Sequence, residues 1–458
     1  MNNFTSSQNQ SALFEEFEKL KKSFSFESKV DEQKFYKKNS YLFATTSASL
    51  FRLLPQVSYS QHKSIFEKLL FNIQLLNLEE KYAELFIEKF EVTDKENILV
   101  KAQNEQPFLF CCFHTGAYSI LPGLLATKSL DFGFLSNQTL TDRKEKLYFE
   151  LHHNYCKKHK INSTPEFINV EESKGIWKAI RMLKEGKSLI VYADGNTGSN
   201  YSKKESQNTV KIDFLGEDLQ VRKGIAFLSY MCNAPIIPVV SSRELSTEEL
   251  NLKRKYTLLP AIYPPNFADA KSKKDTNLKE EFAAQTMQKL YSILEKEITK
   301  NDTNSQQISE WEGWVFVNKF FTKLQKSIFL LEKKNADKSI NNKINPYYIF
   351  NEERFALIES QKNTLFDKFT YRFFPVSDLL YEIITYFSEP KKLYLSNEDA
   401  KQHNQMNKTK TVSSYSPIST NSDSNFIYSD SKLQLSKTLV SVSALEKLIE
   451  KHILIQYD

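Results

Sequence analysis

The chain has 458 residues, 40% of them hydrophobic and 26% charged, which is the composition of a globular protein with two to four domains. Its formal net charge of +6 suits an anionic ligand or a membrane surface, but the basic residues are spread along the chain and do not indicate nucleic-acid binding. No stretch approaches the roughly 18–20 apolar residues that cross a bilayer, and the N-terminus lacks the features of a signal peptide. The four cysteines form no C-x-x-C pair, so no metal or redox site is predicted.

Residues 1–95 are predicted to form an N-terminal helical region. Apolar residues recur there at helical spacing, with charged residues between them, and Pro55 is expected to end one of the helices. The clearest apolar face contains Leu13, Phe14, Phe17 and Leu20.

From about residue 95 to 265, short apolar runs alternate with helical patterns, which indicates an α/β domain with a mostly parallel central sheet flanked by helices. We place this domain at residues 96–330. The first strand includes Cys111 and Cys112, which we interpret as small buried core residues. The predicted strands are Pro107–Phe113, Phe132–Leu135, Ser188–Ala193 and Ile236–Val240, and the predicted helices are 144–158, 174–184, 224–232 and 276–300.

The C-terminal quarter differs in character. A polar linker is predicted at 331–345, followed by a small α+β domain at 346–458. Residues 400–437 are rich in Ser, Asn, Thr and Lys, a composition that predicts disorder. This domain looks like a winged helix, similar to the peptide-recognition domains of ribosomal-peptide modification enzymes, although a generic structural cap explains it equally well. Its predicted elements are a hairpin of Tyr347–Phe350 and Phe355–Ile358, a helix at Val376–Phe387, and a helix and strand within Val442–Ile455.

The main chemical signal is an apolar strand that ends in a histidine, Phe108-Leu-Phe-Cys-Cys-Phe-His-Thr-Gly-Ala-Tyr-Ser119. Parallel sheets place ligand chemistry at the C-terminal ends of their strands, and Gly116 allows a tight turn after His114. A neutral histidine there can remove a proton from an alcohol or amine near neutral pH. His114 is therefore predicted to be a general base, with a packed, hydrogen-bonded core histidine as the alternative.

This segment resembles the H-x-G-x-W-E block of the bacterial lipid A lauroyl/myristoyl acyltransferases, a branch of the lysophospholipid acyltransferase superfamily. His114 and Gly116 match, and Tyr118 takes the aromatic position. The resemblance covers about half of the chain and implies a glycerolipid acyltransferase-like fold, with acyl carrier protein or coenzyme A thioester as donor and no bound cofactor. Four further blocks follow in the family's order: Leu183–Gly195, Val210–Gly216, Arg222–Pro238 and Glu310–Lys319.

The sequence departs from the family at Ser119, where the family has the acid that orients the histidine. A serine hydroxyl can hold one tautomer but supplies no charge. Either another carboxylate, for which Asp194 is the candidate, approaches His114, or the activated donor needs less help, or the domain binds without catalysis. The predicted catalytic set is thus His114, Ser119 and Asp194. The residues predicted to line the acceptor site or hold a phosphate are Thr115, Gly116, Tyr118, Gly195, Asn196, Gly198, Arg222 and Lys223.

The sequence therefore predicts an acyltransferase that moves a fatty acyl group from an acyl thioester to a hydroxyl or amine of a lipid, a peptide or a natural-product intermediate. The chain is expected to be cytoplasmic, with at most peripheral contact with the inner membrane, and not to bind nucleic acid. The alternative is a catalytically inactive acyltransferase-like protein that binds a lipid or peptide and recruits a partner through its C-terminal domain. A hydrolase with Ser119 as nucleophile is disfavoured, because the G-x-S-x-G turn is missing.

Overall fold

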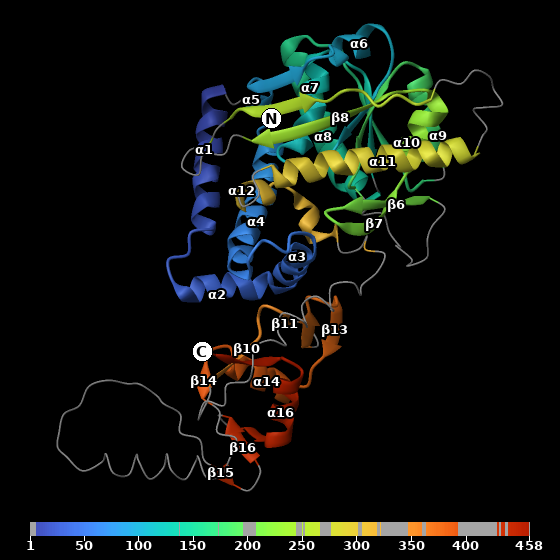
Figure 1. The fold of residues 1–458 in the computed structure, drawn as a ribbon. Helices are drawn as coiled ribbons and strands as arrows, with labels where there is room; N and C mark the ends of the chain where they lie inside the picture. Colours follow the sequence, from blue (N-terminus) through green and yellow to red (C-terminus); the bar gives the residue numbers. More distant parts are fainter. Residues whose placement is uncertain are drawn as a thin grey trace. The chain divides into compact units, whose positions relative to one another are not determined.

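The computed structural model describes residues 6–136, 138–172, 174–195, 208–243, 250, 252–265, 276–300, 305–317, 321, 347–359, 363–392, 428–429, 432–435 and 438–457. Figure 1 shows its helices and strands. The chain divides into two compact units, one of residues 1–32 and 45–323 and the other of residues 33–44 and 324–458. The linker predicted at 331–345 lies outside the described residues, and the division into domains drawn from the sequence stays a prediction.

The N-terminal region is helical, as expected. Its helices are α1 (Ser6–Ser23), α2 (Lys29–Lys38), α3 (Ser40–Leu53), α4 (Tyr59–Lys81) and α5 (Ala83–Ile87). Helix α3 ends before Pro55, since the residue that precedes a proline is disfavoured in helical conformation. Phe14 is 40% exposed, but the other three residues of the predicted face of α1 are buried. Near the end of this region the helical prediction is wrong, because Phe90–Asp94 form strand β1.

A seven-stranded sheet forms the centre of the first unit, in the order β1-β9-β8-β2-β5-β3-β4. The five strands from β8 to β4 run parallel, whereas β9 is antiparallel to β8 and parallel to β1. The predicted mostly parallel sheet is therefore confirmed, and the four predicted strands correspond to β2, β3, β5 and β8. The strands are β2 (Leu109–Cys112), β3 (Phe132–Ser136), β4 (Pro165–Asn169), β5 (Ser188–Tyr192), β8 (Ile236–Arg243) and β9 (Arg254–Leu258).

Both faces of the sheet are covered, so successive side chains of β2 enter two different cores. Leu109, Cys111 and Phe113 pack in a core with residues of α9 (Gly175–Lys184), α10 (Gly224–Cys232) and α11 (Thr276–Thr299). Phe108, Phe110 and Cys112 pack in the other core, with residues of α6 (Ile98–Asn104) and α7 (Leu121–Thr127). Figure 1 shows these helices around the sheet. Cys111 and Cys112 are fully buried free thiols, as interpreted from the sequence.

Smaller elements complete the first unit. A hairpin of β6 (Thr209–Phe214) and β7 (Glu217–Arg222) packs on α11, where the rings of Phe214 and Tyr291 meet edge to face with centroids 5.5 Å apart. Helix α8 (Gln138–His159) packs on β4, and the 3₁₀ helix η1 (Tyr118–Ile120) precedes α7. The short α12 (Ser305–Ile308) and the 3₁₀ helix η3 (Glu312–Val315) follow α11. Among the described residues, no helix combines the length and apolarity needed to cross a bilayer.

In the part of residues 324–458 that the structure describes, the second unit contains three small sheets and helices α14 and α16, with a core of its own. The sheets are β14 (Lys391–Lys392), β10 (Tyr347–Phe350) and β18 (Leu454–Tyr457); β11 (Phe355–Ile358), β12 (Thr364–Asp367) and β13 (Arg372–Pro375); and β15 (Tyr428–Ser429), β16 (Lys432–Leu435) and β17 (Thr438–Ser441). Helices α14 (Asp378–Tyr386) and α16 (Val442–Glu450) confirm the two predicted helices.

Two predictions for this unit differ from the structure. The predicted hairpin of β10 with β11 is wrong, because β10 bonds β14 on one side and β18 on the other, while β11 pairs with β12. The local apolar runs predicted both strands but not their partners. The partner β18 of β10 lies near the C-terminus, far from β10 in the sequence. Within 400–437, for which disorder is predicted, the structure describes only residues 428–429 and 432–435, which are strands. The rest of that segment lies outside the described residues.

Candidate active site

His114 lies just beyond the C-terminal end of β2, between neighbouring strands β5 and β8. The turn after it depends on Gly116, whose φ is +59°, in the left-handed region that glycine adopts without strain. A Cβ atom on Gly116 would lie 2.5 Å from the carbonyl oxygen of Ser241 on β8. The glycine therefore lets the chain turn sharply against the neighbouring strand, as the sequence predicts, and leaves the histidine at the edge of the sheet.

Asp194 follows β5 and is only 1% exposed, yet its carboxylate is well supplied with donors. Oδ1 lies 2.9 Å from Nδ1 of His114, and the backbone N–H of His114 lies 3.2 and 3.1 Å from Oδ1 and Oδ2. Nε1 of Trp311 donates to Oδ2 at 2.8 Å. Because an ionised carboxylate only accepts hydrogen bonds, Nδ1 of His114 carries the proton and Nε2 is left with a lone pair in the neutral ring.

The pair stabilises the charged form of each partner. Burial opposes the imidazolium, but the Asp194 carboxylate outweighs it and raises the pKa of His114 above its ordinary value of 6.5. Burial likewise opposes the carboxylate, but His114 and the Trp311 N–H lower the pKa of Asp194. The His114 side chain keeps 19% of its surface exposed, so the ring is reachable although its partner is buried. This arrangement can accept a proton on Nε2 and hold the resulting positive charge.

A second carboxylate and three aromatic rings complete the surroundings of the imidazole. The backbone N–H of Glu312 donates to the carbonyl of His114 at 2.9 Å, and the Tyr118 hydroxyl donates to Oε2 of Glu312 at 3.0 Å. Burial raises the pKa of Glu312. The rings of Tyr118, Tyr192 and Phe316 have centroids 4.8, 4.8 and 5.8 Å from that of His114.

Several predicted residues belong to this arrangement. Gly195 lies against the imidazole, because a Cβ there would be 3.5 Å from Cε1 of His114. Thr115 is 7% exposed, forms a β-bridge with Trp311, and lines a cavity of about 250 Å³ together with Arg243 and Glu310. Asn196 and Gly198 lie outside the described residues.

Other predicted residues are placed differently. Ser119 is 3% exposed and lines a small apolar cavity of about 50 Å³ beside Phe132 and Phe134, while the Nδ1 position it was expected to hold is taken by Asp194. Lys223 makes an ion pair with Glu280 on α11, and Arg222 ends β7. The described residues contain no cluster of His, Cys, Asp or Glu side chains able to hold a metal ion.

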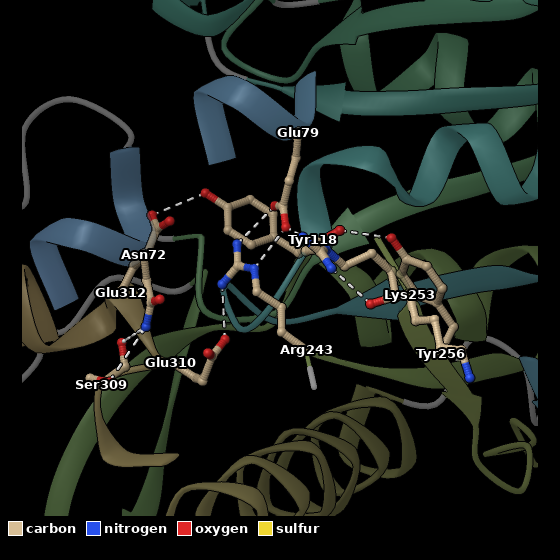
Figure 2. Close-up of polar contacts among 11 residues, drawn as sticks. Asn72, Glu79, Tyr118, Arg243, Lys253, Tyr256, Ser309, Glu310 and Glu312 are labelled. Carbon is tan, nitrogen blue, oxygen red and sulfur yellow. Dashed lines mark hydrogen bonds and ion pairs between the residues drawn. The ribbon is translucent and has the colours of Figure 1, made fainter. Parts of the chain in front are cut away.

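Sequence reasoning missed the part played by the segment after α12. Trp311 is extended and precedes η3, and Trp314 lies in η3. Both are buried, and Trp311 also donates to Asp194, 117 positions earlier in the chain. Figure 2 shows the Tyr118 hydroxyl directed at Glu312, and Arg243 between Glu79 and Glu310. The only sequence signal for this segment is the tryptophan-containing block at its start.

Comparison with known proteins places the chain in a family. No curated protein matches it. The 1-acyl-sn-glycerophosphate (LPA) acyltransferase PlsC from Thermotoga maritima is a structural match with 15% sequence identity, covering 59% of this chain and 94% of that one, but its TM-score of 0.25 is too low to support an argument. The family model for bacterial lipid A biosynthesis acyltransferases matches residues 70–304, just over half of the chain. The chain therefore belongs to the bacterial lipid A biosynthesis acyltransferase family.

Proposed function

We propose that this protein transfers a fatty acyl group from an acyl thioester to a hydroxyl or amine, with Nε2 of His114 as the general base. The observation that carries the proposal is the 2.9 Å contact between Nδ1 of His114 and Asp194 at the C-terminal edge of the sheet. Asp194 would take over the task of the acid that the family places where this chain has Ser119. Unlike a serine hydroxyl, it supplies the negative charge that stabilises an imidazolium.

The proposed reaction has two proton transfers. Nε2 of His114 takes the proton from the acceptor hydroxyl or amine as the acceptor atom attacks the thioester carbonyl carbon. The tetrahedral intermediate then expels the thiolate, and the imidazolium returns the proton to the sulfur. The carbon–sulfur bond is replaced by an ester or amide bond, and the free thiol of coenzyme A or of an acyl carrier protein leaves. Lipid, peptide and natural-product acceptors all fit this chemistry, which requires no bound cofactor.

For the second unit we propose a winged-helix-like fold and a function in recruiting a partner. Strand β13 pairs only with β12 among the described strands and exposes Phe373 and Phe374 by 47% and 44%. An exposed strand edge with apolar side chains is suited to binding an extended peptide by strand addition.

The acyl-transfer proposal is tested by intact-mass analysis of candidate acceptors incubated with acyl thioesters. Transfer adds the mass of the acyl group to the acceptor and releases one thiol for each acceptor modified. In His114→Gln the product should fall to background while the circular dichroism spectrum stays that of the wild type. His153→Gln, at an exposed position on α8, is the matched control and should keep full activity. Acyl transfer that continues in folded His114→Gln would show that His114 is not the base.

A further inference from the structure

Four charged side chains form a buried cluster beside the candidate active site, which we call the Glu79 cluster: Glu79, Arg243, Arg254 and Glu310. Arg243 donates to both oxygens of Glu79 at 2.8 Å and to Oε2 of Glu310 at 2.9 Å. Arg254 donates to Oε1 of Glu79 at 2.6 Å. The side chains of Glu79, Arg243 and Arg254 are at most 1% exposed, and that of Glu310 is 16% exposed.

The geometry of the cluster makes it rigid. Burial opposes the ionised form of Glu79, but the two arginines outweigh it and lower its pKa, so the carboxylate stays charged. Arg243 binds Glu79 through two parallel hydrogen bonds, the arrangement that fixes both the distance and the plane of a guanidinium. Removing one partner of such a buried pair leaves an uncompensated charge, and therefore the arrangement resists rearrangement.

The cluster holds the chain segment that completes the active site. Glu310 is followed by Trp311 and Glu312. The Trp311 indole donates to Asp194, and the backbone N–H of Glu312 donates to the His114 carbonyl. The residue before Glu310 is also bound by α4: the side-chain amide of Asn72 donates to the carbonyl of Ser309 at 3.2 Å. Figure 2 shows the Asn72 contact and the Arg243 contact to Glu310 from the same view. Helix α4 is thus linked to the residues before Trp311 in two ways, directly through Asn72 and through the Glu79–Arg243 pair.

We propose that Arg243, held in place by Glu79, is a positioning residue for the His114–Asp194 pair and acts through Glu310 and Trp311. By fixing Glu310, the guanidinium sets the place from which the Trp311 indole donates to the Asp194 carboxylate. The inference rests on the proposed function, in which that pair moves the proton.

A role limited to stability makes a different prediction. A cluster that only stabilises the fold would, when weakened, lower the resistance to unfolding and leave the Trp311 contact unchanged in the folded molecules. A positioning cluster would change the Trp311 contact in the folded state. The three tryptophans make this distinction measurable, because the ¹⁵N-labelled indole spectrum has three signals. Trp177 on α9, which is 68% exposed, serves as the internal reference.

The test compares Glu310→Gln with Glu217→Gln. Both glutamates accept from a buried arginine, Glu310 at 2.9 Å and Glu217 from Arg52 at 2.7 Å, and their side chains are 16% and 17% exposed. Glutamine keeps the shape and removes the charge. The indole and kinetic measurements are made at alkaline pH, because burial raises the pKa of Glu310 and the wild-type carboxylate must be ionised. The His114 titration is followed separately over a range of pH.

We expect Glu310→Gln to shift the Trp311 indole signal, to speed its exchange with solvent, and to change the His114 titration seen by NMR. With an accepted substrate, kcat should fall by up to about 100-fold with little change in KM, the size of effect that misplacement by about 1 Å can have. Glu217→Gln should lower stability and change neither the indole signal nor kcat. The indole readout needs no activity, so it remains decisive even if the proposed reaction is wrong.

Asn72→Ala is the second variant, because it loosens the same segment without changing any charge. It should move the Trp311 signal in the same direction as Glu310→Gln. If the Trp311 indole and the His114 titration are the same in both variants as in Glu217→Gln, Arg243 does not position the pair and the inference is wrong.

Discussion

Replacing Asp194 with asparagine tests the core of the proposed mechanism. The carboxylate accepts from Nδ1 of His114, from the His114 backbone N–H and from the Trp311 indole, at 2.8–3.2 Å. An amide has one acceptor oxygen. If that oxygen takes the place of Oδ2, it still accepts from Trp311 and from the His114 backbone N–H, and the NH₂ group faces Nδ1 of His114. The neutral ring must then carry its lone pair on Nδ1 and its proton on Nε2, so Nε2 cannot act as a base.

The expected loss follows from these contacts. The equivalent aspartate-to-asparagine change in a serine protease lowers kcat on the order of 10⁴-fold, which corresponds to about 5 kcal/mol of activation free energy. The charge-assisted hydrogen bond from Nδ1 is also lost, so the free energy of unfolding should fall by about 1.5–3 kcal/mol before the surroundings relax.

The assay is initial-rate release of thiol from the acyl thioester, with folding checked by near-UV circular dichroism. Asp367→Asn is the matched control: Asp367 is 3% exposed and accepts from the backbone N–H groups of Phe369 and Thr370, but it lies in the other unit. That variant should lose stability and keep its rate. If folded Asp194→Asn retains more than about a tenth of the wild-type rate, the tautomer argument above is refuted.

Three further predictions follow from the same geometry. Because Asp194 raises the pKa of His114, the acid limb of the kcat/KM profile should have its midpoint above pH 6.5. The stability that the pair adds through His114 should be fully present below pH 6.5 and lost as pH rises through the raised pKa of the native state. A midpoint below pH 6.5, or a contribution of the pair that grows with pH, contradicts this. Gly116→Ala should destabilise the fold more than Gly216→Ala, by about 1–3 kcal/mol in denaturant titrations. Both glycines have positive φ, but only a Cβ at position 116 would meet backbone, at 2.5 Å. Equal losses of stability in the two variants would exclude the clash. Ser119→Ala should keep the rate within about threefold of the wild-type rate, because a neutral core hydroxyl away from Nδ1 contributes at most about 1 kcal/mol. A loss of rate approaching that of Asp194→Asn would show that Ser119 orients the imidazole.

The central part of the fold was predictable because its strands are buried on both faces. Strand β2 is an unbroken apolar run for this reason, and the same holds for the other central strands. Strands β1, β4 and β9 were missed, since they lie at or next to the edges of the sheet and carry charged residues such as Glu91, Glu166 and Lys255. Their pattern alone resembles that of a loop.

The candidate site was predictable as far as local sequence reaches. His114 and Gly116 lie in one motif, and Asp194 follows a strand that the topology places beside β2, so their proximity could be offered as one of several alternatives. The place of Trp311 depends on how a later segment packs across the strand ends, and the Arg243–Glu79 pair joins positions 164 residues apart. No local pattern encodes contacts of that kind.

The segment after α12 has a practical consequence for work with shortened forms of the protein. The region of family similarity ends at residue 304, whereas contacts to the imidazole continue to Phe316. A protein terminated at the family boundary would lack the indole donor to Asp194 and would leave two arginines sharing a single glutamate in the interior. Expression boundaries for the transferase region therefore belong beyond residue 316, and shorter fragments that express poorly or are inert say nothing about the chemistry of the intact chain.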